Sequence, residues 1–506
     1  MQTMITSFAI AAVALASGSA RFAESQLREY LEALTSPAMG GRLTLAPGER
    51  LAADYLAQQF RRIGLEEGPH KGFFHEFEVT VNQRPTSNNV LTFRDRAGQT
   101  WRLSLGEDFV PLAGTRPMRM VNADLVYVGF GLAEDDWNDF EGVDLEGKVA
   151  VMFRGVPEGR RPASNGAKAR WAANKGAVGV IFAGSAVEGR RDLPPLSRGQ
   201  GLAPNTDIVA AAVSERHFER LVGVPIDEAR AVQGPASRPL DWSVRMITET
   251  EPNRGMGRNV IGILLGNDPA VRDEIIVVGA HFDHLGYGEV GSRTGADIIH
   301  PGADDNASGV AGVLALAEYF ATNRTNRRTM IFQLYSGEEV GLVGSAAWVR
   351  DNPETVRRIS AMINLDMIGR LRDGRLTVFS TSSSTEWDAI LDAVAAPDIR
   401  LQKSPTIAAG SDHFPFARAN VPNLFFHTGL TPEYHTENDT VDTINFSGMV
   451  NIVDLVRQVI ENVDGREKLP WNPDAQSGGR RRPAAPPAGT TTPSPNAPTE
   501  ARPAAA

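Results

Sequence analysis

Residues 275–319, IIVVGAHFDHLGYGEVGSRTGADIIHPGADDNASGVAGVLALAEY, decide the fold class of this chain. The stretch opens with a short apolar run, Ile275 to Gly279, which is typical of a fully buried strand. His-Phe-Asp-His follows at 281–284, and a glycine-rich loop leads to Gly-Ala-Asp-Asp-Asn-Ala-Ser-Gly at 302–309 and a helical pattern at 310–320. Open α/β sheets bind ligands at the carboxyl ends of their strands, so imidazoles and carboxylates placed there predict a site for a divalent metal ion.

The same alternation of strand and helix continues along the second half of the chain. The predicted strands are NVIGILL (259–265), EIIVVGA (274–280), RTMIFQLYS (328–336), SAMINLDMIG (360–369), RLTVFST (375–381) and PNLFFHT (422–428), with helical patterns between several of them. Such alternation favours a largely parallel sheet with helices on both faces. The expected fold class is therefore α/β, with a mixed, largely parallel sheet flanked by helices.

The composition limits the classes of function. The 506 residues carry a net charge of −10, which argues against nucleic acid as the main partner because binding phosphates requires a basic face. Hydrophobic residues make up 42% of the chain and charged residues 22%, as in globular proteins. The chain has no cysteine, so any metal ion must be bound by histidine and carboxylate side chains.

Both ends of the chain differ in composition from the rest. Residues 8–16, FAIAAVALA, form a short apolar run followed by small residues, which is typical of a signal peptide cleaved after Ala20, although no Lys or Arg precedes the run. We therefore expect residues 1–20 to be a signal peptide, the protein to be periplasmic or secreted, and no stable membrane span. Residues 466–506 are rich in Pro, Ala and Thr, so we expect them to form a disordered tail.

The sequence pattern changes near Met118 and again near Trp242. ADLVYVGFGL, GVDLEGKVAVMFRG and KARWAANKGAVGVIFAG predict a separate β-rich module between these points. Its only histidine, His217, is expected to be structural. The predicted organisation is an N-terminal part of the catalytic domain at 21–117, a β-rich insert at 118–245, and the main catalytic segment at 246–465.

Further candidate ligands follow the later strands of the catalytic segment. They are Glu338 and Glu339 in Ser-Gly-Glu-Glu, Asp366 after Ile-Asn-Leu, Asp412 and His413 after Gly-Ser, and Tyr434 and His435 in Pro-Glu-Tyr-His-Thr. Acidic residues in front of a helix often only cap it. Capping does not explain carboxylates and imidazoles at the ends of successive strands.

The number of these residues fits a centre with two metal ions. Two ions that share a bridging carboxylate need two histidines and three carboxylates, and one further carboxylate can act as the base. The chain supplies this set as His281, Asp305, Glu338, Glu339, Asp366 and His435. Nitrogen and oxygen ligands without sulfur suit zinc, which cobalt or manganese could replace.

The motifs, taken together, resemble those of peptidase family M28, a family of two-zinc aminopeptidases. They are H-x-D-H, G-A-x-D-N-A-S-G, S-G-E-E-x-G-L-x-G-S, N-L-D-M-I-G and Y-H-T-x-x-D-T, in this order. The segment starting ADLVYVGFGL is similar to the protease-associated (PA) domain, and GGRLTLAPGERLAADYLAQQFRRIGL resembles the start of the family's catalytic domain. The resemblance covers nearly all of residues 21–464 and implies the zinc-exopeptidase (phosphorylase/hydrolase-like) fold with an inserted PA domain.

The resemblance assigns the predicted ligands to two zinc ions. Asp305 matches the carboxylate that bridges both ions. His281 and Asp366 match the ligands that complete one site. Glu339 and His435 match those that complete the other.

The resemblance also implies catalytic roles. Glu338 matches the general base, and Asp283 matches the carboxylate that orients the imidazole of His281. Tyr434 matches a tyrosine that donates to the developing oxyanion in some members. Asp412 and His413 match a Gly-Ser-Asp-His stretch whose residues support the site.

The implied activity is that of a zinc-dependent exopeptidase, which removes N-terminal amino acids from peptides with a free N-terminus by attack of metal-activated water. One open alternative is a carboxypeptidase or dipeptidase on the same scaffold, in which Arg370 could bind a carboxylate. Two others are a glutaminyl cyclase-like acyltransferase with a single zinc and a binding protein that has lost catalysis. The complete set of six residues argues against both of these.

Overall fold

The computed structural model describes residues 22–475, except 70–71, 113, 116–118, 158–159, 161–162, 184–192, 194–207, 295–297 and 395. The predicted signal peptide at 1–20 and residues 476–506 of the predicted tail lie outside the described residues. Among the described residues, no helix is both long enough and apolar enough to cross a bilayer.

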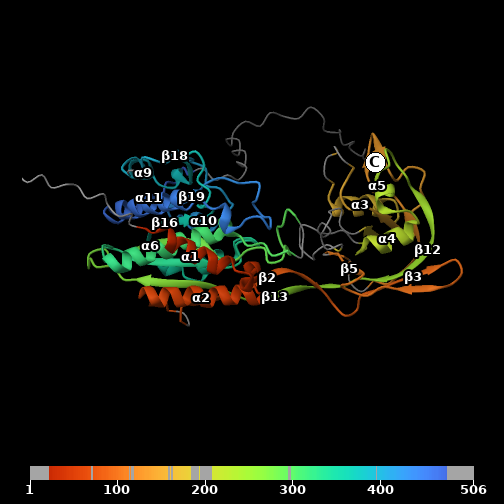
Figure 1. Ribbon diagram of the computed structural model, residues 1–506, viewed down its shortest axis with the longest axis horizontal. Coiled ribbons are helices and arrows are strands. Elements are labelled where there is room, and N and C mark those ends of the chain that lie inside the picture. The colour runs from red at the N-terminus through yellow and green to blue at the C-terminus, as the bar shows by residue number, and fades with distance from the viewer. Residues whose placement is uncertain are drawn as a thin grey trace, which may run out of the picture.

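A nine-stranded mixed sheet forms the larger body of the molecule (Figure 1). Its strands are β1 (Glu66–Glu67), β2 (Phe74–Pro85), β13 (Thr250–Leu264), β14 (Ile275–His281), β15 (Thr329–Tyr335), β16 (Ile359–Leu365), β17 (Arg375–Phe379), β18 (Arg400–Lys403) and β19 (Asn423–His427). They lie in the order β1-β13-β15-β14-β16-β19-β17-β18, and β2 pairs with β13. The central strands β15, β14, β16 and β19 are parallel, whereas β13 is antiparallel to β15 and β17 is antiparallel to β19. The predicted strands and fold class are confirmed.

Helices cover both faces of this sheet. One face carries α1 (Glu24–Thr35), α2 (Pro47–Ile63), α6 (Gly309–Asn323), α9 (Trp387–Asp392) and α11 (Phe446–Asp464), and the other carries α7 (Val343–Asp351), α8 (Pro353–Arg358) and α10 (His413–Arg418). Short helical turns lie at Pro37–Arg42, Ala303–Ser308, Thr381–Ser383 and Val441–Thr443. Side chains of β14 alternate between the two cores, with Ile276 and Val278 in the first and Ile275 and Val277 in the second. This alternation explains the continuous apolar run of a strand that is buried on both faces.

The start of α6 lies directly against the end of β16. A Cβ atom at Gly309 would lie only 2.3 Å from the carbonyl oxygen of Leu365. Only glycine therefore allows this close approach. The approach brings the turn that contains Asp305 next to Asp366, which follows β16.

An eight-stranded sheet forms the second body. Its strands are β3 (Val90–Asp95), β4 (Thr100–Arg102), β5 (Phe109–Pro111), β6 (Val121–Tyr127), β9 (Val149–Met152), β10 (Gly179–Ala183), β11 (Val209–Val213) and β12 (Arg238–Ile247). The same part of the chain contains the helices α3 (Asn165–Asn174), α4 (Glu215–Val222) and α5 (Ile226–Arg230). It also contains a small two-stranded sheet of β7 (Ala133–Glu134) and β8 (Trp137–Asn138). The predicted β-rich module is confirmed, and among the described residues its apolar clusters contain none from the large sheet. In Figure 1, β2 and β13 run from the first body towards the second.

The second sheet begins before residue 118, where the insert was expected to start, because β3, β4 and β5 also belong to this sheet. β3 pairs with β12 in an antiparallel register, so the segments that enter and leave this body lie side by side. The sequence change near Met118 does not mark the point where the chain changes sheets. The Nε2 atom of His217, which was expected to be structural, lies 2.8 Å from Oδ1 of Asp108.

The prediction of disorder from residue 466 onward is wrong for its first ten residues. Leu469 is buried, and its N–H donates to Oγ of Ser360. The N–H of Asn472 donates to the carbonyl oxygen of Ser383, 2.9 Å away. One apolar side chain and a few hydrogen bonds thus attach a segment whose composition is otherwise polar and proline-rich.

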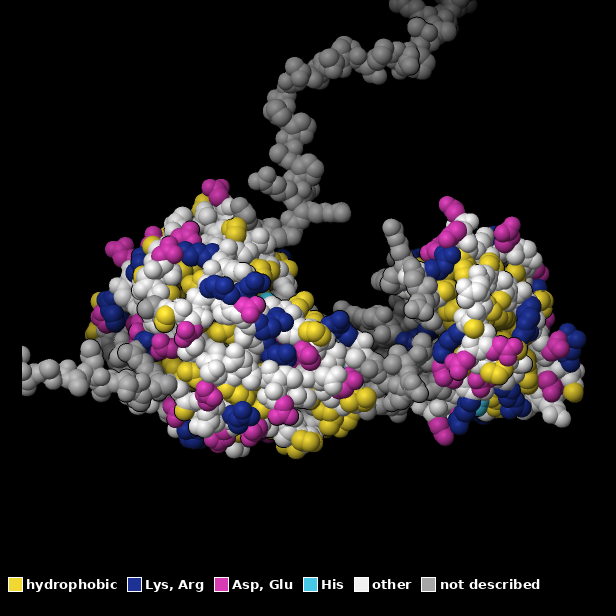
Figure 2. All heavy atoms as spheres, turned by 45° about the horizontal axis from the view of Figure 1, so that its top comes forward, with side chains coloured by type: hydrophobic (Ala, Val, Ile, Leu, Met, Phe, Trp, Pro, Cys, Tyr) yellow, Lys and Arg dark blue, Asp and Glu magenta, His cyan; other side chains and the backbone are white. Residues whose placement is uncertain are grey.

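Acidic and basic side chains are interspersed over the face of the molecule seen in Figure 2. The net negative charge of the chain is therefore distributed rather than gathered into one surface on this side.

Candidate metal centre

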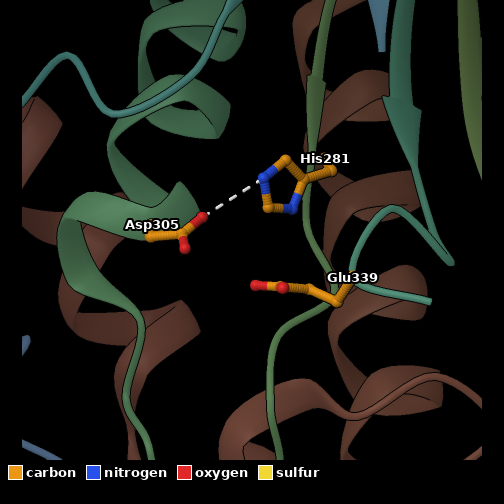
Figure 3. A group of neighbouring side chains, drawn as sticks. All are labelled: His281, Asp305 and Glu339. Atoms are coloured by element: carbon orange, nitrogen blue, oxygen red, sulfur yellow. Dashed lines mark ion pairs between the residues drawn. The ribbon is translucent and has the colours of Figure 1, made fainter. Parts of the chain in front are cut away.

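The residues predicted to bind metal meet at the carboxyl edge of the large sheet. His281 ends β14, Asp305 lies in the turn before α6, Glu338 and Glu339 follow β15, Asp366 follows β16, and His435 lies in the loop after β19. Parallel strands bring their carboxyl ends to the same edge, so residues far apart in the sequence converge there. Figure 3 shows the side chains of His281, Asp305 and Glu339 gathered around a common space.

The imidazole of His281 forms the first part of the centre. Its Nε2 atom lies 3.3 Å from Oδ1 of Asp305, 3.6 Å from Oδ2 of Asp366 and 4.0 Å from Oε2 of Glu338. The hydroxyl of Ser411 donates a 2.5 Å hydrogen bond to Oδ2 of Asp366 and so fixes this carboxylate.

The imidazole of His435 forms the second part. Its Nε2 atom lies 3.1 Å from Oδ2 of Asp305 and 3.3 Å from Oε2 of Glu339. Asp305 therefore presents one oxygen to His281 and the other to His435. A carboxylate placed in this way can bridge two cations.

The centre has an excess of buried carboxylates. Burial alone would lower the pKa of His281, but the carboxylates of Glu338 and Asp366 raise it well above its usual value. Burial would also lower the pKa of His435, but Glu339 and Asp305 raise it to about 11. Both imidazoles thus experience a strongly negative environment, which favours the binding of cations.

The two adjacent glutamates differ in their electrostatics. Burial raises the pKa of Glu338 well above its usual value, and the neighbouring carboxylate of Glu339 raises it further. Burial would likewise raise the pKa of Glu339, as would Asp305, but His435 and a hydrogen bond from His284 lower it to about 2. Glu339 is therefore the glutamate held as a carboxylate, and Glu338 the one that takes up a proton more readily.

Asp283 lies beside His281, but its backbone carbonyl oxygen, rather than the carboxylate expected to orient the imidazole, is within hydrogen-bond distance of His281. The Nδ1 atom of His281 lies 3.2 Å from the carbonyl oxygen of Asp283 and 3.8 Å from its Oδ1 atom. The carboxylate accepts hydrogen bonds from the hydroxyl of Thr44 at 2.9 Å and from the N–H groups of Glu338 and Glu339 at 3.1 and 3.4 Å. Asp283 thus orients the loop that carries both glutamates.

The other predicted residues lie around this centre. The ring of Tyr434 stacks on that of His435 with centroids 3.8 Å apart, and burial together with Asp305 and Glu339 raises its pKa. Asp412 is buried, which raises its pKa to about 7. His413 is buried against Phe425, and burial lowers its pKa to about 3. Neither Asp412 nor His413 belongs to the ligand clusters of the described residues, which fits a supporting role.

Sequence reasoning did not assign a function to several residues that hold the centre together. The guanidinium of Arg42 is fully buried and donates to the carbonyl oxygens of Phe282, Pro301 and Gly302, at 2.7, 2.7 and 3.0 Å. Asp439 accepts hydrogen bonds from the N–H group of Asp305 and from that of the residue before it. The motif G-G-R at 40–42 and the final Asp of Y-H-T-x-x-D-T were the available signals.

The donor atoms fit a divalent metal. One ligand atom from each of His281, Asp305 and Glu339 lies within 4.8 Å of the others, and the same is true of His281, Glu338 and Asp366. Imidazole nitrogens and carboxylate oxygens, with no sulfur, are ligands that zinc accepts. The second cluster contains Glu338, which was predicted to be the base, so distance alone does not separate a ligand from a base here.

Two segments of the chain match the models of known protein families. Residues 259–460, which contain every predicted metal ligand, match the model of peptidase family M28. Residues 121–221 match the model of the PA domain.

Two relatives match over most of this chain. The chain is 24% identical over 448 residues to aminopeptidase YwaD of Bacillus subtilis (strain 168), a match that covers 86% of this chain and 84% of YwaD. It is 26% identical over 499 residues to the probable glutamate carboxypeptidase VP8 of Zea mays, covering 84% of this chain but only 64% of that relative. The chain thus spans somewhat less than two thirds of the maize protein.

The fold is also that of a solved structure. BSAP, a zinc aminopeptidase from Bacillus subtilis, superposes with a TM-score of 0.58 at 21% identity, covering 88% of this chain and 95% of BSAP. The M28 match covers most of the large sheet and the PA match covers part of the second sheet, and the cluster of buried ligands lies within the M28 match. The chain therefore carries one segment that matches peptidase family M28 and another that matches the PA domain.

Proposed function

We propose that this protein is a two-zinc aminopeptidase that removes N-terminal amino acids from peptides. The observation that carries the proposal is the position of Asp305, whose two carboxylate oxygens lie 3.3 and 3.1 Å from the Nε2 atoms of His281 and His435. A carboxylate between two imidazoles, with one further carboxylate beside each, supports a pair of metal ions rather than a single ion.

The proposed ligand sets follow from these contacts. His281 and Asp366 would hold one ion, Glu339 and His435 would hold the other, and Asp305 would serve both. When bound, two zinc ions would lower the pKa of a water molecule towards neutrality and polarise the peptide carbonyl. Cobalt or manganese could occupy the same donors.

Glu338 is the proposed general base. Its side chain is 12% exposed, so a water molecule or a peptide can reach it, and Nε2 of His281 lies 4.0 Å from its Oε2 atom. Burial and the neighbouring carboxylates raise its pKa, which suits a group that accepts a proton and then releases it to the leaving amine. Tyr434 is proposed to donate its hydroxyl proton to the developing oxyanion.

Electrostatics favour a substrate with a free amino terminus. The buried carboxylates around the centre would attract an ammonium group. A carboxypeptidase would instead need a cation for the substrate's carboxylate, and the candidate was Arg370. Its guanidinium lies 3.2 Å from Oε2 of Glu433, which neutralises it, and its side chain is 15% exposed.

Carboxypeptidase activity is the second candidate, because Arg370 lies four residues beyond Asp366 and the maize relative is named as a probable glutamate carboxypeptidase. In that case a substrate carboxylate would have to displace Glu433 from Arg370. Substitution of Glu433 by Gln would then improve the binding of peptides with a free carboxyl terminus.

The test is a comparison of initial rates on a panel of aminoacyl-amides and short peptides, each with a free and an N-acetylated amino terminus. An aminopeptidase should cleave only the free forms, and Glu338→Gln provides the control for contaminating activity. Zinc is measured per chain in the same preparation. Equal cleavage of acetylated and free substrates, or one tightly bound zinc per chain, would contradict the proposal.

A further inference from the structure

A third imidazole, that of His284, lies beside the metal centre and belongs to neither of the proposed ligand sets. His284 is the last residue of the motif His-Phe-Asp-His and is fully buried. Its Nδ1 atom lies 2.8 Å from Oε1 of Glu339 and 4.0 Å from Oδ2 of Asp305. The contact with Glu339 is thus a hydrogen bond, whereas the distance to Asp305 is too long for one.

This hydrogen bond divides the two oxygens of Glu339 between two partners. Oε1 faces His284, and Oε2 lies 3.3 Å from Nε2 of His435. Because a carboxylate only accepts hydrogen bonds, Nδ1 of His284 must carry the proton. Its Nε2 atom is buried and has no hydrogen-bond partner among the described residues.

The ring of His284 is held firmly in place. Its backbone N–H donates to the carbonyl oxygen of Arg42, 3.1 Å away. A Cβ atom at Gly302 would lie 2.5 Å from Cδ2 of the ring, so the backbone of Gly302 packs directly against it. A fixed ring fixes the direction of its Nδ1–H group, and therefore the rotation of the Glu339 carboxylate.

Glu338 has no comparable partner. Within the described part of the chain, its carboxylate accepts no hydrogen bond, and its nearest cationic atom is Nε2 of His281 at 4.0 Å. Two glutamates of identical chemistry therefore differ in that one is oriented by a buried donor and the other is not.

We propose that His284 is the positioning residue that makes Glu339, and not Glu338, a metal ligand. Its Nδ1–H group occupies Oε1 of Glu339 and directs Oε2 to the ion that His435 also binds. Hydrogen bonds to metal-binding side chains are commonly needed for tight metal binding, because they fix the orientation of these side chains. The inference rests on the proposed two-zinc function, since it concerns one of the two sites.

The test compares two substitutions of nearly equal shape. His284→Asn places an amide N–H close to the position of Nδ1–H, whereas His284→Leu places a methyl group there. Zinc is removed stepwise from the full-length protein by competition with a chelator. In His284→Leu, one of the two zinc ions should dissociate about 10- to 100-fold more readily, while the other keeps its affinity. His284→Asn should recover most of the loss.

Two further measurements separate positioning from general damage. The thermal midpoint of the zinc-free protein should be similar in His284→Asn and His284→Leu. A purely structural defect would instead lower the midpoint of the zinc-free His284→Leu variant. Zinc X-ray absorption of the wild type should show the imidazoles of His281 and His435 only. If His284→Leu does not fold, His284→Ala replaces it in the comparison.

Several outcomes would overturn the inference. The inference fails if His284→Leu leaves the affinity for both zinc ions unchanged or lowers it equally at both sites. It also fails if His284→Asn loses as much zinc affinity as His284→Leu. An absorption spectrum that loses an imidazole ligand in His284→Leu would make His284 a ligand itself. A wild type that binds a single zinc would instead contradict the proposed function, so the two failures are distinguishable.

Discussion

The hydroxyl of Thr44 donates a 2.9 Å hydrogen bond to Oδ2 of Asp283, a residue 239 positions further along the chain. Asp283 in turn accepts hydrogen bonds from the N–H groups of Glu338 and Glu339. The N-terminal segment, the end of β14 and the loop after β15 are therefore linked through a single buried carboxylate.

Removing the hydroxyl of Thr44 should weaken the connection through Asp283, and a valine in its place keeps nearly the same side-chain volume. We expect Thr44→Val to lower kcat/KM by about 10-fold, because two N–H donors to Asp283 remain. Thr44→Ser keeps the hydroxyl and is the matched control, expected to remain within about 2-fold of the wild type. The measurement is kcat/KM on an aminoacyl-amide. Equal rates for the two variants would show that the hydroxyl is not needed.

The adjacent glutamates should respond differently to the same substitution. Glu338→Gln removes the proposed base, so we expect it to retain both metals and lose about 10²- to 10⁴-fold in kcat. Glu339→Gln should lower the occupancy of one metal site, and added zinc should restore part of the activity. Asp305→Asn should affect both sites, because its two oxygens face both imidazoles.

Metal content by elemental analysis and kcat are measured together for these variants. Full activity in Glu338→Gln would refute its role as base. Loss of the metals from Glu338→Gln, with two tightly held metals in Glu339→Gln, would reverse the assignment of the two residues.

The metal-free protein should become less stable as the pH rises above neutrality. The pKa of His435 is raised to about 11 because the carboxylates of Glu339 and Asp305 outweigh the effect of burial. A raised pKa in the folded state means that the contribution of the protonated imidazole is complete below its ordinary pKa of about 6.5 and is lost as the pH rises towards about 11. The free energy of unfolding should fall by at most about 1.4 kcal/mol per pH unit from this group.

Thermal unfolding of the zinc-free protein between about pH 6.5 and pH 9 measures this effect. The zinc-loaded protein should show a smaller dependence, because metal ligation requires the neutral imidazole. His435→Asn should flatten the dependence in the zinc-free protein. A thermal midpoint of the zinc-free wild type that does not change over this range would contradict the prediction.

It should be possible to remove the PA domain by a deletion at the ends of the paired strands β2 and β13. Pro85 pairs with Thr250, and the apolar clusters of the second sheet, so far as the structure describes them, contain no residue of the large sheet. Replacing residues 86–249 by Asn-Gly would close the two strands into a hairpin. We expect the shortened protein to fold and to cleave aminoacyl-amides.

The same variant tests whether the PA domain limits the size of the substrate. If it does, cleavage of large peptides relative to small amides should increase when residues 86–249 are absent. The ratio of kcat/KM for a long peptide and an aminoacyl-amide is the measurement. A folded, active variant with an unaltered ratio would show that the PA domain does not select by size.

Much of the site follows from the sequence because its pattern is local. A buried strand followed at once by imidazole or carboxylate can be recognised in a few residues, as at Ile275 to His281 and at Ile359 to Asp366. Parallel pairing then places such ends at one edge of the sheet, whatever lies between them in the chain. For this reason the proposed ligands could be named from the sequence, and the structure brings them together.

The sequence by itself determined the order of strands and helices, the presence of a second β-rich body and the set of groups available to a metal. Tertiary structure alone decided where the second sheet begins, because the pairing of β3 with β12 joins residues about 150 apart. It also decided which groups orient the ligands: Thr44 reaches Asp283, and His284 reaches Glu339, across long intervals of chain. Such hydrogen bonds depend on the direction of individual side chains in a folded core, and residue type and spacing do not encode that direction locally.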